Sequence, residues 1–220
     1  MPSMLHMKPR SVRLLKIPVF MVCLFPLGKL AMEAFGIAGL NLGANPIEEM
    51  LHRCGLWGLN FLLITLTVTP LRRISGWNWL LRFRRMLGLF SFFYLSLHFS
   101  IYAGLDQSFD FSAIAEDILK RPYITLGITG LFLLIPLAVT SNAAMMRRLG
   151  RRWLQLHRLV YIVAILGTWH FYWQVKKDVL EPVIYAAVLA LLLGFRLAVY
   201  WHRKRRAIPH RKESLAVSRG

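Results

Sequence analysis

Residues 87–102 read LGLFSFFYLSLHFSIY, an apolar stretch that contains a single histidine, His98. A stretch this apolar is typical of a helix that crosses a lipid bilayer. An imidazole ring in hydrocarbon is costly, so a histidine in such a helix needs a compensating partner. A second stretch, LVYIVAILGTWHFYW at residues 159–173, places His170 in the same kind of surroundings. The sequence therefore predicts membrane-embedded helices that carry functional histidines.

The composition supports this fold class. The chain has 220 residues, of which 56% are hydrophobic and 17% are charged, and its mean hydropathy is +0.49. Soluble globular proteins average about 25% charged residues. Apolar segments of roughly 20 residues recur along the chain, each about long enough to cross a bilayer. We expect an all-α membrane protein.

The predicted architecture is a bundle of six transmembrane helices. The spans are expected at about residues 17–37, 54–70, 86–105, 123–141, 153–175 and 179–201. Together they form one domain, residues 17–201. A cytoplasmic segment, residues 1–16, precedes this domain, and a basic cytoplasmic tail, residues 202–220, follows it. No repeat of fixed period is expected.

The basic residues gather on one side of the predicted bundle. The N-terminal segment, the 71–85 and 142–152 loops and the tail carry 20 Lys or Arg and one acid, Glu213. The loops on the opposite side carry five basic and eight acidic residues. Because positive residues in short loops mark the cytoplasmic side, both termini are expected in the cytoplasm. Topology and attraction to anionic lipids explain the net charge of +18, and no nucleic-acid partner is expected.

His98 and His170 lie at similar predicted depths. Helix rise places His98 about 12 Å and His170 about 9 Å from the outer boundary. Two imidazoles at one depth on parallel helices favour axial ligation of a b-type haem, whose faces require an apolar slot. Zinc is disfavoured, because no nearby cysteine or carboxylate completes a tetrahedral site. Helix-packing histidines and a proton relay or transport site stay open as alternatives.

Other polar residues lie towards the two membrane surfaces. His157 is in the inner third, level with Arg84 and Arg85, and arginine does not ligate iron. A second bis-histidine haem therefore lacks an evident partner. His157, Arg158, Arg84 and Arg85 are candidate contacts for a haem propionate, a quinol or a flavin phosphate. His52, at the outer start of the second span, is a secondary candidate.

Two further pairs of residues are expected to be structural. Lys29 and Glu33 are four residues apart in the first span and can pair on one helix face. Cys23 and Cys54 have no metal-ligand spacing, so we interpret them as small buried apolar residues.

Four segments resemble a known family. They read NPIEEMLHRCGLWGLNFLLITLTVTPLRR, RRMLGLFSFFYLSLHFSIY, RPYITLGITGLFLLIPLAVTS and LGRRWLQLHRLVYIVAILGTWHFYW. In the same order, they resemble the haem-binding membrane subunit of the bacterial periplasmic methionine sulfoxide reductase system, within the ferric-reductase-like transmembrane group. The resemblance covers roughly residues 40–200.

The resemblance implies a bacterial inner-membrane b-type cytochrome that acts as an electron-transfer subunit, without a catalytic reductase site of its own. It implies electrons from the respiratory quinone pool and delivery to a periplasmic molybdenum-cofactor (molybdopterin) catalytic subunit that repairs oxidised envelope proteins. The family's haem-linked histidines fall on His98, His157 and His170, and flavin mononucleotide (FMN) is also associated with the family. In oxidase and metalloreductase relatives the third span carries two histidines, whereas here the inner one is absent. One haem b is therefore expected, and a second is left unassigned.

Two other functions fit parts of the sequence. A metalloreductase would keep the haem and reduce ferric or cupric ions directly at the outer face. A haem-free transporter would use the histidines and the Lys29–Glu33 pair for protons, but the sequence lacks matched Gly/Pro-interrupted helices. Only 19 residues follow Trp201, so no nicotinamide-binding domain is expected there.

Overall fold

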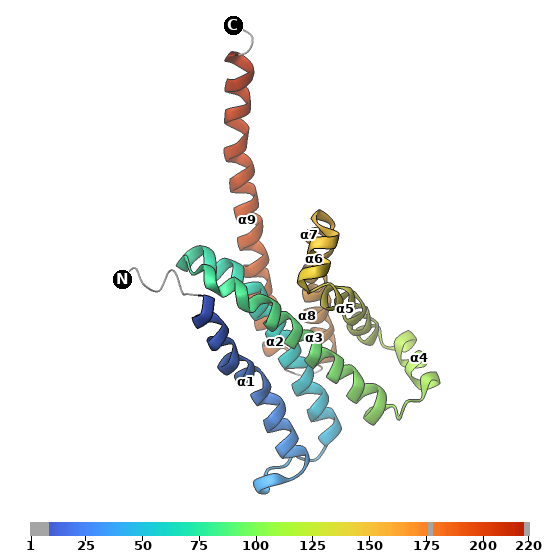
Figure 1. The fold of residues 1–220 in the computed structure, drawn as a ribbon. Helices are drawn as coiled ribbons and strands as arrows, with labels where there is room; N and C mark the ends of the chain where they lie inside the picture. Colours follow the sequence, from blue (N-terminus) through green and yellow to red (C-terminus); the bar gives the residue numbers. More distant parts are fainter. Residues whose placement is uncertain (1–8, 176–177, 218–220) are drawn as a thin grey trace.

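The computed structural model describes residues 9–175 and 178–217, and these residues form a helical bundle (Figure 1). The helices are α1 (Pro9–Ala34), α2 (Pro46–Ser75), α3 (Leu81–Ile101), α4 (Phe111–Lys120), α5 (Pro122–Val139), α6 (Ala143–Leu149), α7 (Arg151–Leu156), α8 (Leu159–Gln174) and α9 (Leu180–Val217). Short 3₁₀ turns, η1 (Ile37–Gly39) and η2 (Asn78–Leu80), and a π-helical turn, η3 (Tyr102–Asp106), complete the described part. Residues 1–8 and 218–220 of the predicted terminal segments, and Lys176 and Lys177 of the predicted outer loop, lie outside the described residues.

Five helical segments are long and apolar enough to cross a membrane. They are Arg10–Ala34, Pro46–Ser75, Asn78–Asp106, Pro122–Val139 and Leu180–Arg205. They cover five of the six predicted spans, so a multi-pass membrane protein is supported by length and composition. The number of six spans stays a prediction.

The remaining predicted span, 153–175, is not one continuous helix. A turn at His157 and Arg158 separates α7 from α8. There the Arg158 N–H donates to Gln155 and the Tyr161 N–H donates to Arg158, so the backbone bonds switch to a three-residue spacing. The 16 residues of α8 rise about 24 Å, less than a hydrocarbon core of about 30 Å.

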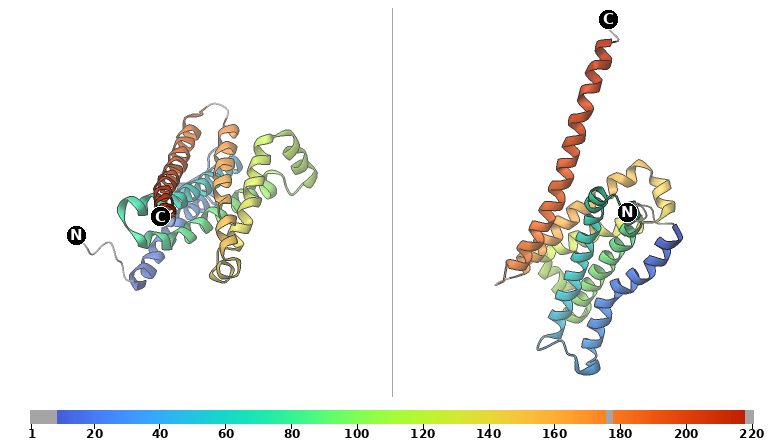
Figure 2. Two further views of the ribbon diagram at one scale, coloured as in Figure 1. Left: turned by 90° about the horizontal axis from the view of Figure 1, so that it is seen from above. Right: turned by 90° about the vertical axis from the view of Figure 1, so that its left-hand side faces the viewer.

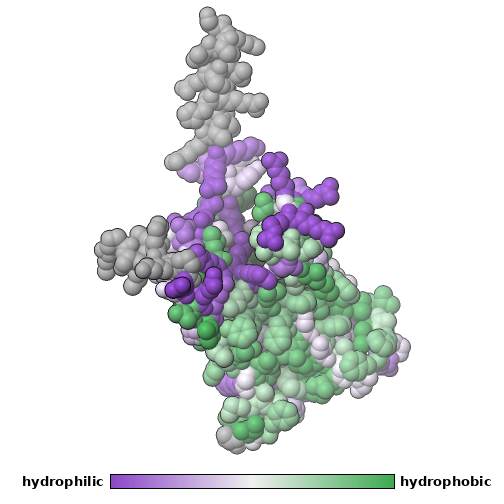
Figure 3. Space-filling view, in the orientation of Figure 1, coloured by the Kyte–Doolittle hydropathy of each residue, from purple (hydrophilic) through white to green (hydrophobic). Residues whose placement is uncertain are grey.

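The bundle is built from two helix pairs. Helix α2 packs along α3, and α5 packs along α8, with α1 against α3 and α9 against α8 and α2 (Figures 1 and 2). The N-terminal end of α1, the α2–α3 connection, α6–α7 and the projecting end of α9 all lie at the upper end in Figure 1. Hydrophilic residues gather there above a hydrophobic band (Figure 3). This is the arrangement that the positive-inside rule requires, and the cytoplasmic location of the termini stays a prediction.

The predicted structural pairs are found in the fold. Lys29 Nζ lies 3.8 Å from a Glu33 carboxylate oxygen, and the Glu33 side chain is only 7% exposed. Arg53 of α2 also pairs with Glu33, which joins α1 to α2. Cys23 and Cys54 are buried free cysteines, as predicted.

Polar contacts attach α9 to the bundle. The Arg196 guanidinium donates to the Tyr161 hydroxyl at 3.1 Å and to the backbone carbonyl of Leu66. About three helical turns nearer the start of α9, the Tyr185 hydroxyl donates to the Asn60 side chain at 2.9 Å. Because a polar group in an apolar surrounding needs a partner, these contacts fix the register of α9 against α2 and α8.

A buried tyrosine joins α1 to α3. The Tyr94 hydroxyl donates to the Cys23 carbonyl at 2.9 Å and accepts from the Leu27 N–H at 3.1 Å. These two backbone groups are an i, i+4 pair of α1, next to Pro26, which itself has no N–H to donate. The hydroxyl therefore bridges the helix ladder at the point where proline weakens it.

Tyr94→Phe should lower the free energy of unfolding by about 1–3 kcal/mol, because two backbone groups of α1, one of them buried, lose their shared partner. Thermal unfolding of the purified protein in detergent measures this change. Tyr200→Phe, at an exposed position, is the control and should leave stability unchanged. Equal stability of the Tyr94 variant and the wild type would show that the bridge contributes nothing.

Candidate functional site

The two helix pairs enclose a cavity of about 230 Å³. Its lining comes from α2, α3, η3, α5 and α8 and is mainly apolar. The lining residues are Leu51, His52, Gly55, Leu56, Leu59, Leu62, Leu95, His98, Phe99, Tyr102, Asp106, Arg121, Tyr123, Ile124, Gly127, Ile128, Gly130, Leu131, Val163, Gly167, His170, Phe171 and Gln174. The structure therefore brings His98 and His170 to one cavity.

Each histidine is held by a backbone carbonyl of the helix beside it. His98 Nδ1 lies 2.8 Å from the Leu51 oxygen, and His170 Nδ1 lies 2.6 Å from the Tyr123 oxygen. A carbonyl oxygen only accepts, so Nδ1 is the protonated nitrogen of both rings. Each Nε2 consequently keeps its lone pair and is a potential metal ligand.

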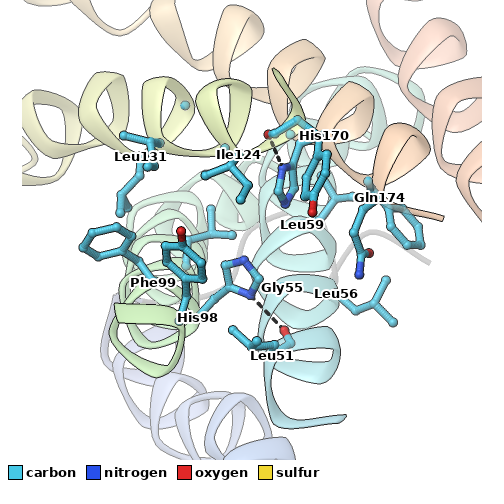
Figure 4. A pocket seen from close by; sticks show the side chains of 18 of the residues that line it. Leu51, Gly55, Leu56, Leu59, His98, Phe99, Ile124, Leu131, His170 and Gln174 are labelled. Atoms are coloured by element: carbon cyan, nitrogen blue, oxygen red, sulfur yellow. Dashed lines mark hydrogen bonds between the residues drawn. The ribbon is translucent and has the colours of Figure 1, made fainter. Parts of the chain in front are cut away.

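The two rings face each other across the cavity. Their centroids are 6.1 Å apart and their planes are nearly perpendicular, at 83°. In Figure 4 the nitrogen of each ring that makes no hydrogen bond points into the space between the rings. Imidazole nitrogens bind transition metals at about 2 Å, so two rings on opposite sides of one ion have centroids about 6 Å apart. The observed separation fits one metal ion between two axial imidazoles.

The site contains an internal repeat that the sequence analysis missed. The chain separation between histidine and acceptor carbonyl is 47 residues in both pairs. A shift of 72 residues superimposes GLWGL at 55–59 on GITGL at 127–131, and the HF of 98–99 on the HF of 170–171. The expectation of no fixed-period repeat is therefore wrong for the two hairpins that build this site. This shared pattern was the sequence signal for the acceptor positions Leu51 and Tyr123.

Two of the repeated glycines lie under the imidazole rings. A Cβ atom on Gly55 would be 3.2 Å from His98 Nδ1, and one on Gly127 would be 3.0 Å from His170 Nδ1. Each glycine is four residues after the acceptor carbonyl, on the same helix face. The absence of a side chain there lets the ring approach the helix closely enough to reach the carbonyl.

The polar lining residues lie together at one end of the cavity, which we call the mouth. They are His52, Tyr102, Asp106, Arg121, Tyr123 and Gln174. At the mouth, Arg121 Nε lies 3.2 Å from Asp117, whose other oxygen accepts from the Tyr102 hydroxyl at 3.1 Å. Asp117 raises the pKa of the Arg121 guanidinium, which therefore stays positively charged.

The structure does not bring the predicted inner residues into the cavity. His157 stacks on Trp153, with ring centroids 3.9 Å apart, and its Nδ1 lies 3.1 Å from the Trp153 carbonyl. Its Nε2 is buried and has no hydrogen-bond partner among the described residues. Arg158 and Arg85 are exposed, Arg84 is half-buried, and none of these four predicted residues lines the cavity.

Gly127→Ala should lower the free energy of unfolding by about 1–3 kcal/mol, because the new methyl group displaces His170 from its carbonyl. Thermal unfolding in detergent measures this. Gly194→Ala is the matched control, since its Cβ would meet no atom within 4 Å and alanine favours a helix. A Gly127 variant as stable as the Gly194 variant would contradict the close contact.

Known proteins are similar in sequence to this chain over most of its length. Residues 54–168 match the family model described as "Ferric reductase like transmembrane component". Among the similar proteins is one of Azospira oryzae, with 52% identity over 86% of this chain and 81% of its own length. Others come from Rhodospirillum rubrum, with 52% identity over 88% of this chain and 92% of its own length, and Ralstonia nicotianae, with 48% over 93% and 94%. All three are named "Protein-methionine-sulfoxide reductase heme-binding subunit MsrQ".

The matched region contains α3, most of α2 and α8, and the whole α4–α7 segment between them. It includes His98 and most of the cavity lining, and the lining residues outside it are Leu51, His52, His170, Phe171 and Gln174. The chain therefore belongs to the MsrQ family, within the ferric reductase-like transmembrane proteins.

Proposed function

We propose that this chain is a b-type cytochrome of the bacterial inner membrane that passes electrons from the quinol pool to a periplasmic methionine sulfoxide reductase. The single observation that carries this proposal is the facing pair of imidazoles, His98 and His170, with both Nε2 lone pairs free. The names of the relatives, which describe heme-binding subunits, support it.

The residues of the cavity fit a haem. His98 and His170 would hold its iron, and the leucine, isoleucine and phenylalanine side chains of the lining would cover its apolar faces. The hydrogen bonds from Nδ1 to the carbonyls fix ring orientation and increase the basicity of Nε2. When bound, a b-type haem supplies a one-electron redox centre.

The distribution of charge supports the direction of transfer. The end of the bundle with few acidic residues would face the cytoplasm, and the mouth, with Asp106 and Asp117 near it, would face the periplasm. A haem held by His98 and His170 would lie close to the mouth, and this short distance to the periplasmic side favours a periplasmic acceptor. We propose the molybdopterin-containing catalytic subunit as that acceptor, so the chain would have no reductase site of its own.

Electron entry is proposed at the opposite end. His157 offers a buried Nε2 that has no hydrogen-bond partner in the described part of the chain, and Arg84, Arg85 and Arg158 supply positive charge there. A quinol proton or a flavin phosphate matches these groups chemically. FMN rests on the family resemblance alone, and a second haem lacks a paired histidine at His157 in the described structure.

The family-model description favours a second candidate, direct reduction of ferric ions at the outer face. Both functions need the haem, and they differ in the acceptor. The purified chain with a reduced quinol analogue should reduce ferric chelates slowly and should transfer electrons quickly when the periplasmic reductase is added. Rapid ferric reduction without the partner would support the metalloreductase instead.

His98→Ala and His170→Ala should each lose most of the low-spin haem, because each removes one axial ligand. Reduced-minus-oxidised spectra and haem content per purified chain measure this loss. His157→Ala should perturb the spectrum without removing the haem, since His157 does not line the cavity.

His52→Ala is the control, because His52 lines the mouth but does not belong to the facing pair of His98 and His170. Its ring centroid is 6.1 Å from that of Phe171, and its haem spectrum should stay close to that of the wild type. Loss of haem equal to that of the His98 variant would refute the assignment of His98 and His170 as the ligands.

A further inference from the structure

We propose that Arg121 binds a propionate carboxylate of the haem at the mouth of the cavity, and that Asp117 and Tyr102 hold the guanidinium in place. This proposal rests on the proposed function, because it requires haem in the cavity. It assigns a role to Arg121, a residue that the sequence analysis did not select.

The cavity is divided between an apolar interior and a polar mouth. The deeper lining contains Leu59, Leu62, Leu131 and Val163, whereas the polar side chains lie where α2 and α5 begin and where α3 and α8 end. A b-type haem has the same division, with an apolar macrocycle and two carboxylates on one edge. The carboxylates therefore belong at the mouth, because an unpaired carboxylate in the apolar interior would lose its hydration without gaining a partner.

Arg121 is the cation available at the mouth. Apart from histidines, it is the one basic side chain of the described residues that lines the cavity. Arginine presents a planar fork of N–H donors that matches a carboxylate. Its Nε lies against Asp117, and the Tyr123 side chain is a second neighbour of the guanidinium. Because a guanidinium has five N–H donors, these two neighbours leave donors for a further acceptor. The side chain is 53% exposed, so it is accessible to an incoming carboxylate.

The neighbours of Arg121 act as positioning residues. Asp117, near the end of α4, contacts Arg121 through one oxygen and accepts from the Tyr102 hydroxyl through the other. Tyr102 itself begins the π-helical turn η3 and lines the cavity. The Tyr102 hydroxyl thus connects the end of α3 to Asp117 of α4, and Asp117 in turn contacts Arg121. This gives α4, a helix that the sequence analysis did not predict, a part in the site.

The mouth also contains a carboxylate that opposes anion binding. Asp106 lines the cavity, and its side chain accepts from Gln107 at 2.8 Å. Two propionates near this group need a compensating positive charge. The inner residues Arg84, Arg85 and Arg158 do not supply it, because they do not line the cavity.

The chain offers a matched control one residue away. Lys120 pairs with Glu116 with the same i, i+4 spacing as Arg121 and Asp117, and both side chains are well exposed, at 71% and 60%. Neither residue lines the cavity. Lys120→Ala therefore removes a positive charge and an ion pair from the same helix end without touching the mouth.

The test compares haemin with its dimethyl ester, in which both propionates are neutral. The full-length protein, produced without haem and purified in detergent, is titrated with each compound for the wild type, Arg121→Ala, Arg121→Lys and Lys120→Ala. Loss of a hydrogen bond to a charged group is worth about tenfold or more in affinity, so the wild type should prefer haemin over the ester by about that factor.

Arg121→Ala should reduce this preference to about threefold or less, Arg121→Lys should restore part of it, and Lys120→Ala should keep it in full. If Arg121 had a purely structural role, its substitution would lower the affinities for haemin and for the ester alike and leave the ratio of the two affinities unchanged. The proposal is therefore overturned if Arg121→Ala keeps the wild-type ratio.

The outcomes separate this proposal from the proposed function. Formation of a low-spin haem spectrum with an unchanged ratio in Arg121→Ala would refute the propionate contact and leave the His98–His170 ligation intact. A wild-type protein that forms no low-spin complex with either compound would refute both.

Discussion

The hydrogen bond from each imidazole to a backbone carbonyl is the interaction on which the site depends. It satisfies one nitrogen of a ring that would otherwise be costly in an apolar bundle, and it leaves the other nitrogen with a lone pair directed into the cavity. The helices supply these carbonyls only because glycine follows four residues later, at Gly55 and Gly127. Packing of α2 on α3 and of α5 on α8 is thus coupled directly to the chemistry of the pair.

Much of the fold and part of the site could be predicted from the sequence. Apolar length located most of the membrane helices, and helix rise from the outer boundary placed His98 and His170 at one level, where the structure brings their rings to 6.1 Å. The break at His157 and Arg158 was missed, because hydropathy does not register a local change from i, i+4 to i, i+3 hydrogen bonding. The short helix α4 was also missed. It lies within a polar connection between two spans, where a search for long apolar segments does not detect a 10-residue helix.

Backbone partners and the polar mouth were the parts that the sequence did not reveal. An acceptor carbonyl has no side-chain signature, so Leu51 and Tyr123 could be found only through the repeated glycines. The count of Lys and Arg residues assigned most of the positive charge to the inner side. It included Arg121 among the five basic residues of the outer loops, but a count gives no single residue a role. The importance of Arg121 depends on the cavity beside it, which requires the three-dimensional arrangement of four helices.

The repeat has a consequence for how the protein is made. Each imidazole is oriented by the neighbouring helix of its own hairpin, His98 by α2 and His170 by α5. A hairpin that has entered the membrane during synthesis can therefore hold its histidine in the correct tautomer before the other hairpin has been translated. Docking of the two hairpins then creates the pair in one step. Biogenesis would consequently deliver two half-sites that are already preorganised.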